Sequence, residues 1–352
     1  MKLNKQIIFI LIVFFKTGTV LSENNLFNVN NIQLEKKDKS TNNALANLAI
    51  KKGFNQLIAK ILLKKDSDKL SDLSLSSIKR LVTYYQISNT SDEKKNVNNN
   101  VEKINFNISF DKDKIHNLFY RKGISYSKIT NKELFILPIL KQNNKIYIYS
   151  QNFFYDKWNE TNDEELIEFI LPLENIETIQ NVNLNRNNLL NLKLKNIFIE
   201  YEDKNLALIL IEDNNFKEEK IYIKAKILGK NIVKNINIKR LNLNKDKFYK
   251  KIITEVKQEI IYLIKSQNLI DIRAPSFLNA ELKINKKSNL VVLNSRLKNI
   301  NLIENIYVQE LNNESIFLKI KYLGKLDEII RQLEIHKIIL KLNANQWSIK
   351  II

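Results

Sequence analysis

In the first third of the chain, apolar residues alternate with polar ones in some stretches and recur every three to four positions in others. The first pattern predicts strands, and the second predicts amphipathic helices. Residues 26–34 alternate as a half-buried strand does, and residues 41–62 carry apolar side chains at helical spacing. A short helix, two strands joined by a polar loop and a further helix follow. Asp111 suits the start of that helix and Gly123 its end. The pattern predicts an N-terminal α+β domain over residues 24–125.

The middle of the chain begins with a run that is apolar on both faces. The run ELFILPIL is typical of a central strand, and we expect Pro138 to mark its end. A second apolar run ends at Pro172, and a weakly helical stretch follows it. We expect three further strands at NIFIEYE, LALILIED and KIYIKAKIL, and a long amphipathic helix over residues 244–268. These elements indicate an α/β domain over residues 130–270.

The last segment of the chain alternates strands and helices in a known order. Apolar positions over residues 277–352 predict strand, helix, strand, strand, helix, strand and a final strand. The first six elements have the βαββαβ order of ferredoxin-like domains, and the seventh adds an edge strand. We therefore expect an α+β protein made of three small α/β units in series, the last of them ferredoxin-like.

The first 22 residues have the layout of a secretory signal peptide. Two lysines precede the unbroken apolar run Ile7–Phe15, and a zone of small residues leads to Ser22. The run stops at Lys16, whereas a transmembrane helix needs about 20 apolar residues. We expect cleavage near Ser22 and a periplasmic or secreted product. The alternative is an uncleaved N-terminal anchor.

Composition narrows the chemistry and the partners of this chain. It has no cysteine, which excludes disulfides, thiolate metal sites and lipidation at cysteine. Its formal net charge is +19, but only seven of its 57 basic residues are arginine, the residue that binds phosphates and bases bidentately. The lysines are scattered, as expected for a genome rich in A and T. Nucleic acid is therefore a disfavoured partner, whereas an anionic membrane surface would suit the lysines.

Candidate catalytic residues are few. His116 and His336 fall in different predicted domains, which disfavours a histidine-based metal site or catalytic triad. The sequence contains no glycine-rich phosphate loop. The carboxylate pair Asp111 and Asp113 lies at a predicted helix start, where the helix dipole favours negative charge. We predict no catalytic residue, no metal and no cofactor, so an enzymatic role is the less favoured interpretation.

The best candidate for a binding surface follows the predicted central strand. The stretch YIYSQNFFYDKW is predicted to form a short strand and a polar aromatic loop, and aromatic side chains supply rigid contact area at interfaces. The loops after the two proline-ended strands are expected on the same rim. Alternatively, Phe153, Phe154 and Trp158 pack onto the sheet. The segment 123–132 before the strand is interpreted as a seam between domains. The residues predicted to bind are Tyr149, Phe153, Phe154, Tyr155 and Trp158.

Four stretches of the sequence carry a resemblance to a known family. They are LFNVNNIQLEKKDKSTNNALANLAIKKGFNQLIAKIL, KIHNLFYRKGISYSKITNKELFILPILKQNNKIYIYSQNFFYDKW, LIEFILPLENIETIQNVN and YLGKLDEIIRQLEIHKIILKLNANQWSI. On these stretches the chain resembles a bacterial family of exported proteins known as domain of unknown function 2066. Its middle domain is distantly similar to the N-terminal domain of the periplasmic TolB protein. The family has no assigned activity, so the resemblance implies export and architecture but no chemistry.

Two functions follow from these inferences. The leading hypothesis is a non-enzymatic binding or assembly module of the cell envelope, which contacts another envelope protein through the middle domain. It predicts an apolar surface patch. The alternative is a periplasmic enzyme or small-ligand-binding protein whose site lies at the strand ends of the middle domain. It predicts a pocket with converging carboxylates, and the sequence leaves the small molecule unidentified.

Overall fold

The computed structural model divides the chain into two compact units. Unit 1 combines residues 1–126 with residues 269–352, and unit 2 comprises residues 127–268. Helices and several small sheets make the protein α+β, as predicted. The predicted signal peptide and the polar loop before Glu102 lie outside the described residues. The structure describes residues 26–36, 41–89, 102–129, 132–160, 166–213, 218–283, 289–312, 314–343 and 346–352.

The N-terminal part of unit 1 is an antiparallel sheet of three strands, in the order β1-β3-β2, with helices packed on it. Asp111 caps α5 as expected, because it accepts hydrogen bonds from two amides of the first turn. Thr41 caps α2, and its Oγ1 accepts a hydrogen bond from the Ala44 amide at 3.2 Å. Gly123 ends α5 at φ 60°, a conformation that favours glycine. The elements are β1 (Asn28–Lys36), α2 (Asn42–Ile61), α3 (Lys64–Ser67), η1 (Asp68–Leu70), α4 (Leu75–Arg80), β2 (Val82–Asn89), β3 (Glu102–Phe110) and α5 (Lys112–Lys122).

The C-terminal part of unit 1 has the predicted βαββαβ order with one added strand. The sheet order is β13-β14-β12-β16-β15. The added strand β16 does not lie at the edge: it pairs parallel with β12 and antiparallel with β15. β15 therefore lies at the edge of the sheet, and its second half is exposed. The elements are β12 (Ser276–Lys283), α10 (Asn289–Lys298), β13 (Ile303–Leu311), β14 (Ser315–Tyr322), α11 (Leu326–Ile335), β15 (Ile338–Asn343) and β16 (Gln346–Ile351).

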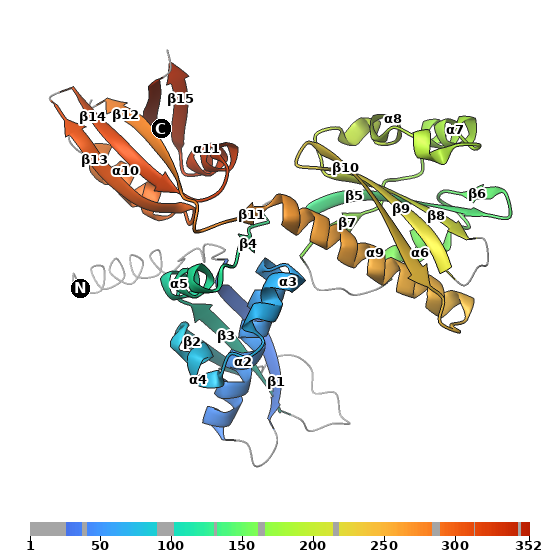
Figure 1. The fold of residues 1–352 in the computed structure, drawn as a ribbon, viewed down its shortest axis with the longest axis horizontal. Helices are drawn as coiled ribbons and strands as arrows, with labels where there is room; N and C mark the ends of the chain where they lie inside the picture. The colour runs from blue at the N-terminus through green and yellow to red at the C-terminus, as the bar shows by residue number, and fades with distance from the viewer. Residues whose placement is uncertain are drawn as a thin grey trace, which may run out of the picture. The chain divides into compact units, whose positions relative to one another are not determined.

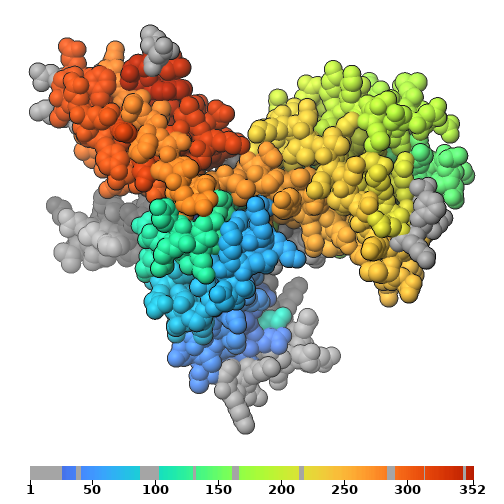
Figure 2. Space-filling model, viewed as in Figure 1, coloured from blue at the N-terminus to red at the C-terminus, as the bar shows by residue number. Residues whose placement is uncertain are grey.

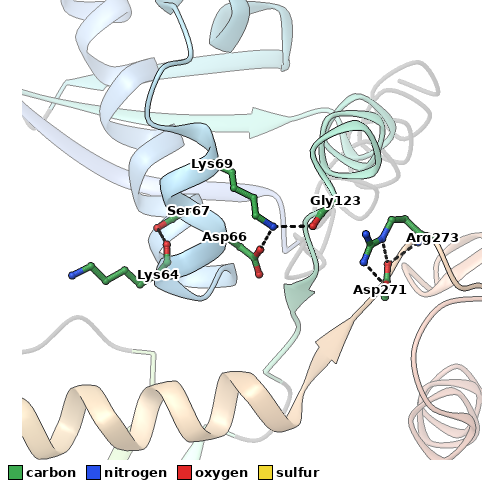
Figure 3. Close-up of polar contacts among 7 residues, drawn as sticks. All are labelled: Lys64, Asp66, Ser67, Lys69, Gly123, Asp271 and Arg273. Atoms are coloured by element: carbon green, nitrogen blue, oxygen red, sulfur yellow. Dashed lines mark hydrogen bonds and ion pairs between the residues drawn. The ribbon is translucent and has the colours of Figure 1, made fainter.

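A polar cluster in unit 1 joins segments that are distant in the sequence (Figure 3). Lys69 Nζ lies 2.6 Å from Asp66 Oδ1 and donates to the Gly123 carbonyl at 3.0 Å, so it ties η1 to the end of α5. The Arg273 guanidinium binds both carboxylate oxygens of Asp271, at 2.9 and 2.8 Å. The chain leaves unit 1 through β4 (Tyr126–Ser127) and returns through β11 (Leu269–Ile270). The cluster therefore lies at the segment interpreted as a seam.

The two parts of unit 1 share one hydrophobic core and an ionic contact. His116 of α5 is buried, and its Nδ1 lies 3.4 Å from Glu304 Oε1 of β13. Lys112 Nζ lies 3.7 Å from the same oxygen. The hydrogen bond from His116 is the main cause that holds the pKa of Glu304 below its ordinary value. His116 thus links two secondary-structure elements from opposite ends of the chain.

Unit 2 is built on a sheet with helices on both faces (Figure 1). The main sheet order is β10-β9-β8-β5-β6, and β7 also pairs with β5. The parallel strands β5 and β8 are buried on both faces, as continuous apolar runs predict. α9 and α6 pack on one face, and α7 and α8 pack on the other. The elements are β5 (Glu133–Gln142), β6 (Lys145–Tyr147), α6 (Phe153–Lys157), η2 (Trp158–Glu160), β7 (Glu168–Ile170), α7 (Ile176–Leu184), η3 (Leu189–Asn191), α8 (Leu194–Ile197), η4 (Ile199–Tyr201), β8 (Leu206–Asp213), β9 (Glu218–Ile227), β10 (Lys230–Lys239) and α9 (Lys245–Gln267).

Pro138 lies inside β5 rather than at its end, so the prediction for its position is wrong. On one side β5 pairs continuously with β8, with Pro138 opposite Ile209. On the other side β7 pairs with the first residues of β5 and β6 with the last, which leaves a gap at the proline. The Pro138 carbonyl faces this gap and accepts a hydrogen bond from Asn152. Because a residue's N and C=O point to the same side of a strand, the proline interrupts no ladder bond.

Three local predictions in unit 2 are also corrected. NIFIEYE forms the end of α8 and the 3-10 helix η4 instead of a strand, with Tyr201 stacked on Phe135 at 4.1 Å between ring centroids. The polar strand β10, which the pattern did not predict, forms a hairpin with β9 instead. The polar aromatic loop is the helix α6. The first case has a local cause, because a short apolar run fits a helical turn as well as a strand.

Candidate functional site

The five aromatic residues predicted to bind contribute to the core of unit 2. Phe154 and Trp158 have no exposed surface, and Tyr149 is 4% exposed. Phe154 and Trp158 are four residues apart along α6 and η2, so both side chains point to the same side and pack under α9. Phe153 and Tyr155 are half-buried. Phe154 and Trp158 therefore form core, as the alternative interpretation proposed, and Tyr149 is buried as well. The binding role of the five residues stays a prediction.

Asn152 holds this aromatic segment against the sheet. Its side chain is fully buried, and its Nδ2 donates to the carbonyls of Pro138, Tyr147 and Ile148 at 2.9, 3.1 and 2.9 Å. Its Oδ1 accepts from the Phe154 amide at 3.1 Å and so caps α6. One side chain thus satisfies buried backbone groups from β5, from the end of β6 and from α6.

The loops that follow β5 and β7 line one pocket in unit 2, at the rim where ligands bind in open α/β sheets. Tyr155 Oη of α6 donates to the Pro172 carbonyl at 2.8 Å and so fixes the loop after β7 to α6. Burial raises the pKa of the Tyr149 phenol in the pocket wall. The pocket has a volume of about 430 Å³. Its lining residues are Asn144, Lys145, Ile146, Tyr147, Ile148, Tyr149, Ser150, Gln151, Glu174, Ile179, Asn183 and Arg186.

Beside this pocket, α7 carries apolar side chains that no other described part of unit 2 covers. The side chains of Leu173, Ile176 and Leu184 are 83%, 73% and 84% exposed. Ile176 and Leu184 are eight residues apart and share one side of the helix, whereas Thr178 and Val182 are buried on the other. We call Leu173, Ile176 and Leu184 the α7 face. In the space-filling view the segment that holds α7, in yellow-green, lies on the outside of its unit (Figure 2).

The carboxylates at the end of β8 are tied into the sheet. Asp213 accepts a hydrogen bond from Gln142 Nε2 at 2.8 Å and one from the Tyr249 hydroxyl. Burial, and then this hydrogen bond, raise the pKa of the Tyr249 phenol. Lys141 Nζ lies 3.3 Å from Glu212 Oε1 on the neighbouring strand. These contacts join β5, β8 and α9, so they stabilise the carboxyl ends of the two parallel strands.

Among the residues that the structure describes, no group of three or more histidines, cysteines or carboxylates is arranged to hold a metal ion. Within the same ranges, no helix has the length and apolar character needed to cross a bilayer. His116 lies in the N-terminal part of unit 1 and His336 follows α11 in the C-terminal part.

Comparison with known proteins gives no match. No family model, no curated protein and no solved structure matches this chain. The resemblance to an exported family of unknown function and to the TolB N-terminal domain therefore stays a prediction, and the site must be interpreted from its own geometry.

Proposed function

We propose that this chain is an exported, non-enzymatic binding or assembly module of the cell envelope, which binds another envelope protein through the α7 face of unit 2. The observation that carries the proposal is the α7 face itself, because three large apolar side chains are 73% to 84% exposed beside a polar pocket. Exposed apolar surface rimmed by polar residues is typical of protein interaction sites. The layout of residues 1–22 supports export.

The size of the α7 face indicates what the partner must supply. Burial of one large apolar side chain contributes about 1.5–3 kcal/mol, so the three together would contribute roughly 4–9 kcal/mol. Association costs about 4–15 kcal/mol in lost translational and rotational freedom. The α7 face can therefore serve as the anchor of a larger interface. Lys145, Glu174 and Arg186 of the adjoining pocket would form its polar rim.

The partner we expect is a folded envelope protein that presents a complementary apolar surface. α7 packs Thr178 and Val182 toward its own sheet, whereas Ile176 and Leu184 at the two ends of its outer side would gain free energy by contact with a second protein. A small polar ligand would leave Leu173 and Leu184 in water. The exposure of these two leucines therefore favours a protein partner over a metabolite.

A small-ligand-binding protein is the second candidate, and the pocket beside α7 is the observation that favours it. Its volume of about 430 Å³ lies in the range of small-molecule sites, roughly 300–1,000 Å³. Arg186 and Lys145 would orient an anionic group there. The discriminating change is Arg186→Gln, which should abolish stabilisation by such a ligand but leave a protein complex anchored on the α7 face largely intact.

The test of the leading proposal is affinity purification from the detergent-solubilised envelope of the source organism. The variant is Leu173→Ser, Ile176→Ser and Leu184→Ser together, and the matched control is Val233→Ser, an equally apolar residue of β10 that is 67% exposed. We expect specific envelope proteins to be retained by the wild type and the control and lost by the triple variant. Retention of the same proteins by the triple variant would refute the α7 face as the binding surface.

A further inference from the structure

A groove with a cationic rim lies between α4 and α5 in the N-terminal part of unit 1. Its volume is about 840 Å³. Four of its ten lining residues are cationic and none is acidic. Its floor is apolar, because Leu81 and Leu118 are buried there. The lining residues are Leu73, Ser77, Arg80, Leu81, Lys114, Asn117, Leu118, Tyr120, Arg121 and Lys122.

The cations stand on both walls of the groove. Arg80 is the last residue of α4, whereas Lys114 and Arg121 lie two helical turns apart on α5. Seven residues of α-helix span about 10.5 Å, so these two side chains mark out a length of roughly that size along one wall. Lys122 continues the rim, and the ring of Tyr120 is 61% exposed beside it. The positive charge is therefore distributed along the groove and is not concentrated at one point.

Little of this charge is neutralised by the chain itself. Lys114 Nζ lies 3.4 Å from Asp111, the cap of the same helix. The guanidinium of Arg80 donates to the Ser77 hydroxyl at 3.1 Å, and that of Arg121 donates to the Asn117 carbonyl at 3.3 Å. Both acceptors are uncharged. Within the described ranges, neither arginine forms an ion pair with a carboxylate.

We propose that this groove binds an acidic, extended segment of another polypeptide. Carboxylates of the segment would contact the cations of the rim, and its apolar side chains would cover the leucines of the floor. A chain in the extended polyproline II conformation has three residues per turn and advances about 3.1 Å per residue, so carboxylates three residues apart lie on one side at a spacing of about 9 Å, close to the separation of Lys114 and Arg121. Arg80 faces them from α4 and offers bidentate hydrogen bonds to a carboxylate. This surface belongs to unit 1 and is independent of the α7 face.

Other anionic partners fit the groove less well. A single phosphate would reach the cations at one end only. A nucleic acid strand would bring no apolar groups to Leu81 and Leu118, and it would find one exposed ring, Tyr120, on which to stack a base. A membrane surface is broad and flat, whereas these cations line a concave groove. The combination of an apolar floor with a long cationic rim is specific to an acidic amphipathic peptide.

The test is fluorescence anisotropy with the purified full chain and a labelled peptide that has glutamate at every third position and leucine or serine between. The variant is Arg80→Gln with Arg121→Gln. The control is Lys51→Gln with Lys79→Gln, which removes the same charge from exposed helix positions of unit 1 outside the groove. We expect the arginine variant to weaken binding roughly tenfold and the control to bind as the wild type does. Added salt should weaken the wild-type complex.

Several outcomes would overturn the proposal. One is that the arginine variant binds the glutamate peptide as tightly as the control variant does. Another is that the wild type binds a peptide with glutamine in place of glutamate as tightly as it binds the glutamate peptide. Oligothymidylate and vesicles that contain anionic phospholipid serve as comparison probes, and tighter binding of either by the groove would show that the partner class is wrong. Far-UV circular dichroism checks the fold of each variant. Tyr120→Ala, which alters an exposed ring, is a second variant and should weaken peptide binding a few-fold.

Discussion

Replacement of Asn152 by alanine tests how the strand-end rim of unit 2 is held. Two N–H groups of the Asn152 amide serve three backbone carbonyls, and its oxygen accepts the Phe154 amide, all at 2.9 to 3.1 Å and in a fully buried position. Each buried hydrogen bond contributes about 1 kcal/mol net. Two N–H donors and one acceptor oxygen correspond to three full hydrogen bonds, so their loss should lower the free energy of unfolding of unit 2 by roughly 3 kcal/mol.

The assay is urea denaturation followed by tryptophan fluorescence. Trp158 lies in unit 2 and Trp347 in unit 1, and the chain has no other tryptophan. In a Trp347→Phe background the signal therefore reports unit 2 alone. With a slope of about 2 kcal/mol per molar urea, the expected loss moves the midpoint down by roughly 1.5 M.

The control for this prediction is Asn231→Ala at an exposed position of β10, which should change the free energy of unfolding by less than about 0.5 kcal/mol. A midpoint shift for Asn152→Ala no larger than that of the control would refute the reasoning, because it would show that the buried amide does not hold β5, β6 and α6 together.

Three further predictions concern both units. The pKa of Glu304 is lowered, chiefly by His116, so the ionised carboxylate stabilises unit 1. This stabilisation is present above the ordinary pKa near 4.5 and is lost as the pH falls through the lowered value. Glu304→Gln should therefore make hydrogen exchange in β13 less dependent on acid pH. Gly123→Ala should destabilise unit 1 by about 1–2 kcal/mol in thermal unfolding, because residue 123 has φ 60°. Asp111→Ala should cost about 1 kcal/mol through loss of the α5 cap, whereas exposed Asp113→Ala should cost less.

Local signals made much of the fold predictable. The helix α9 could be placed to within a residue at either end, because its apolar spacing is regular and Asn244 caps it through the Lys247 amide. Asp111 and Gly123 marked the ends of α5, because both residue types are favoured at helix ends. The continuous apolar run of β5 correctly indicated a strand covered on both faces. Each of these signals depends on neighbours within a few residues.

Features that depend on distant partners were not predictable in this way. Pro138 is tolerated because β6 and β7 leave a gap beside the centre of β5, and no local pattern reveals that gap. The polar strand β10 exists because it pairs with β9 along its whole length. The position of β16 between β12 and β15 is likewise a matter of tertiary pairing.

The candidate site shows the same division. The sequence directed attention to the loops after β5 and β7, and one residue of each, Asn144 and Glu174, lines a pocket, but a binding role of this rim stays a prediction. It could not show that Phe154 and Trp158 are covered by α9, which follows them by about a hundred residues. The α7 face left a weak signal, because its two helical members, Ile176 and Leu184, stand at the ends of a short helix with polar residues exposed between them. Only the structure shows that Val182 faces the sheet and Leu184 faces solvent.

The most direct test of the central claim is site-specific photocrosslinking in the source organism. A benzophenone amino acid replaces Leu184 in one strain and Val233, an exposed residue of the same unit, in another. We predict a discrete crosslinked product with an envelope protein from position 184 and none of that mass from position 233. The same products from both positions, or none from position 184, would contradict the account that the α7 face binds an envelope protein.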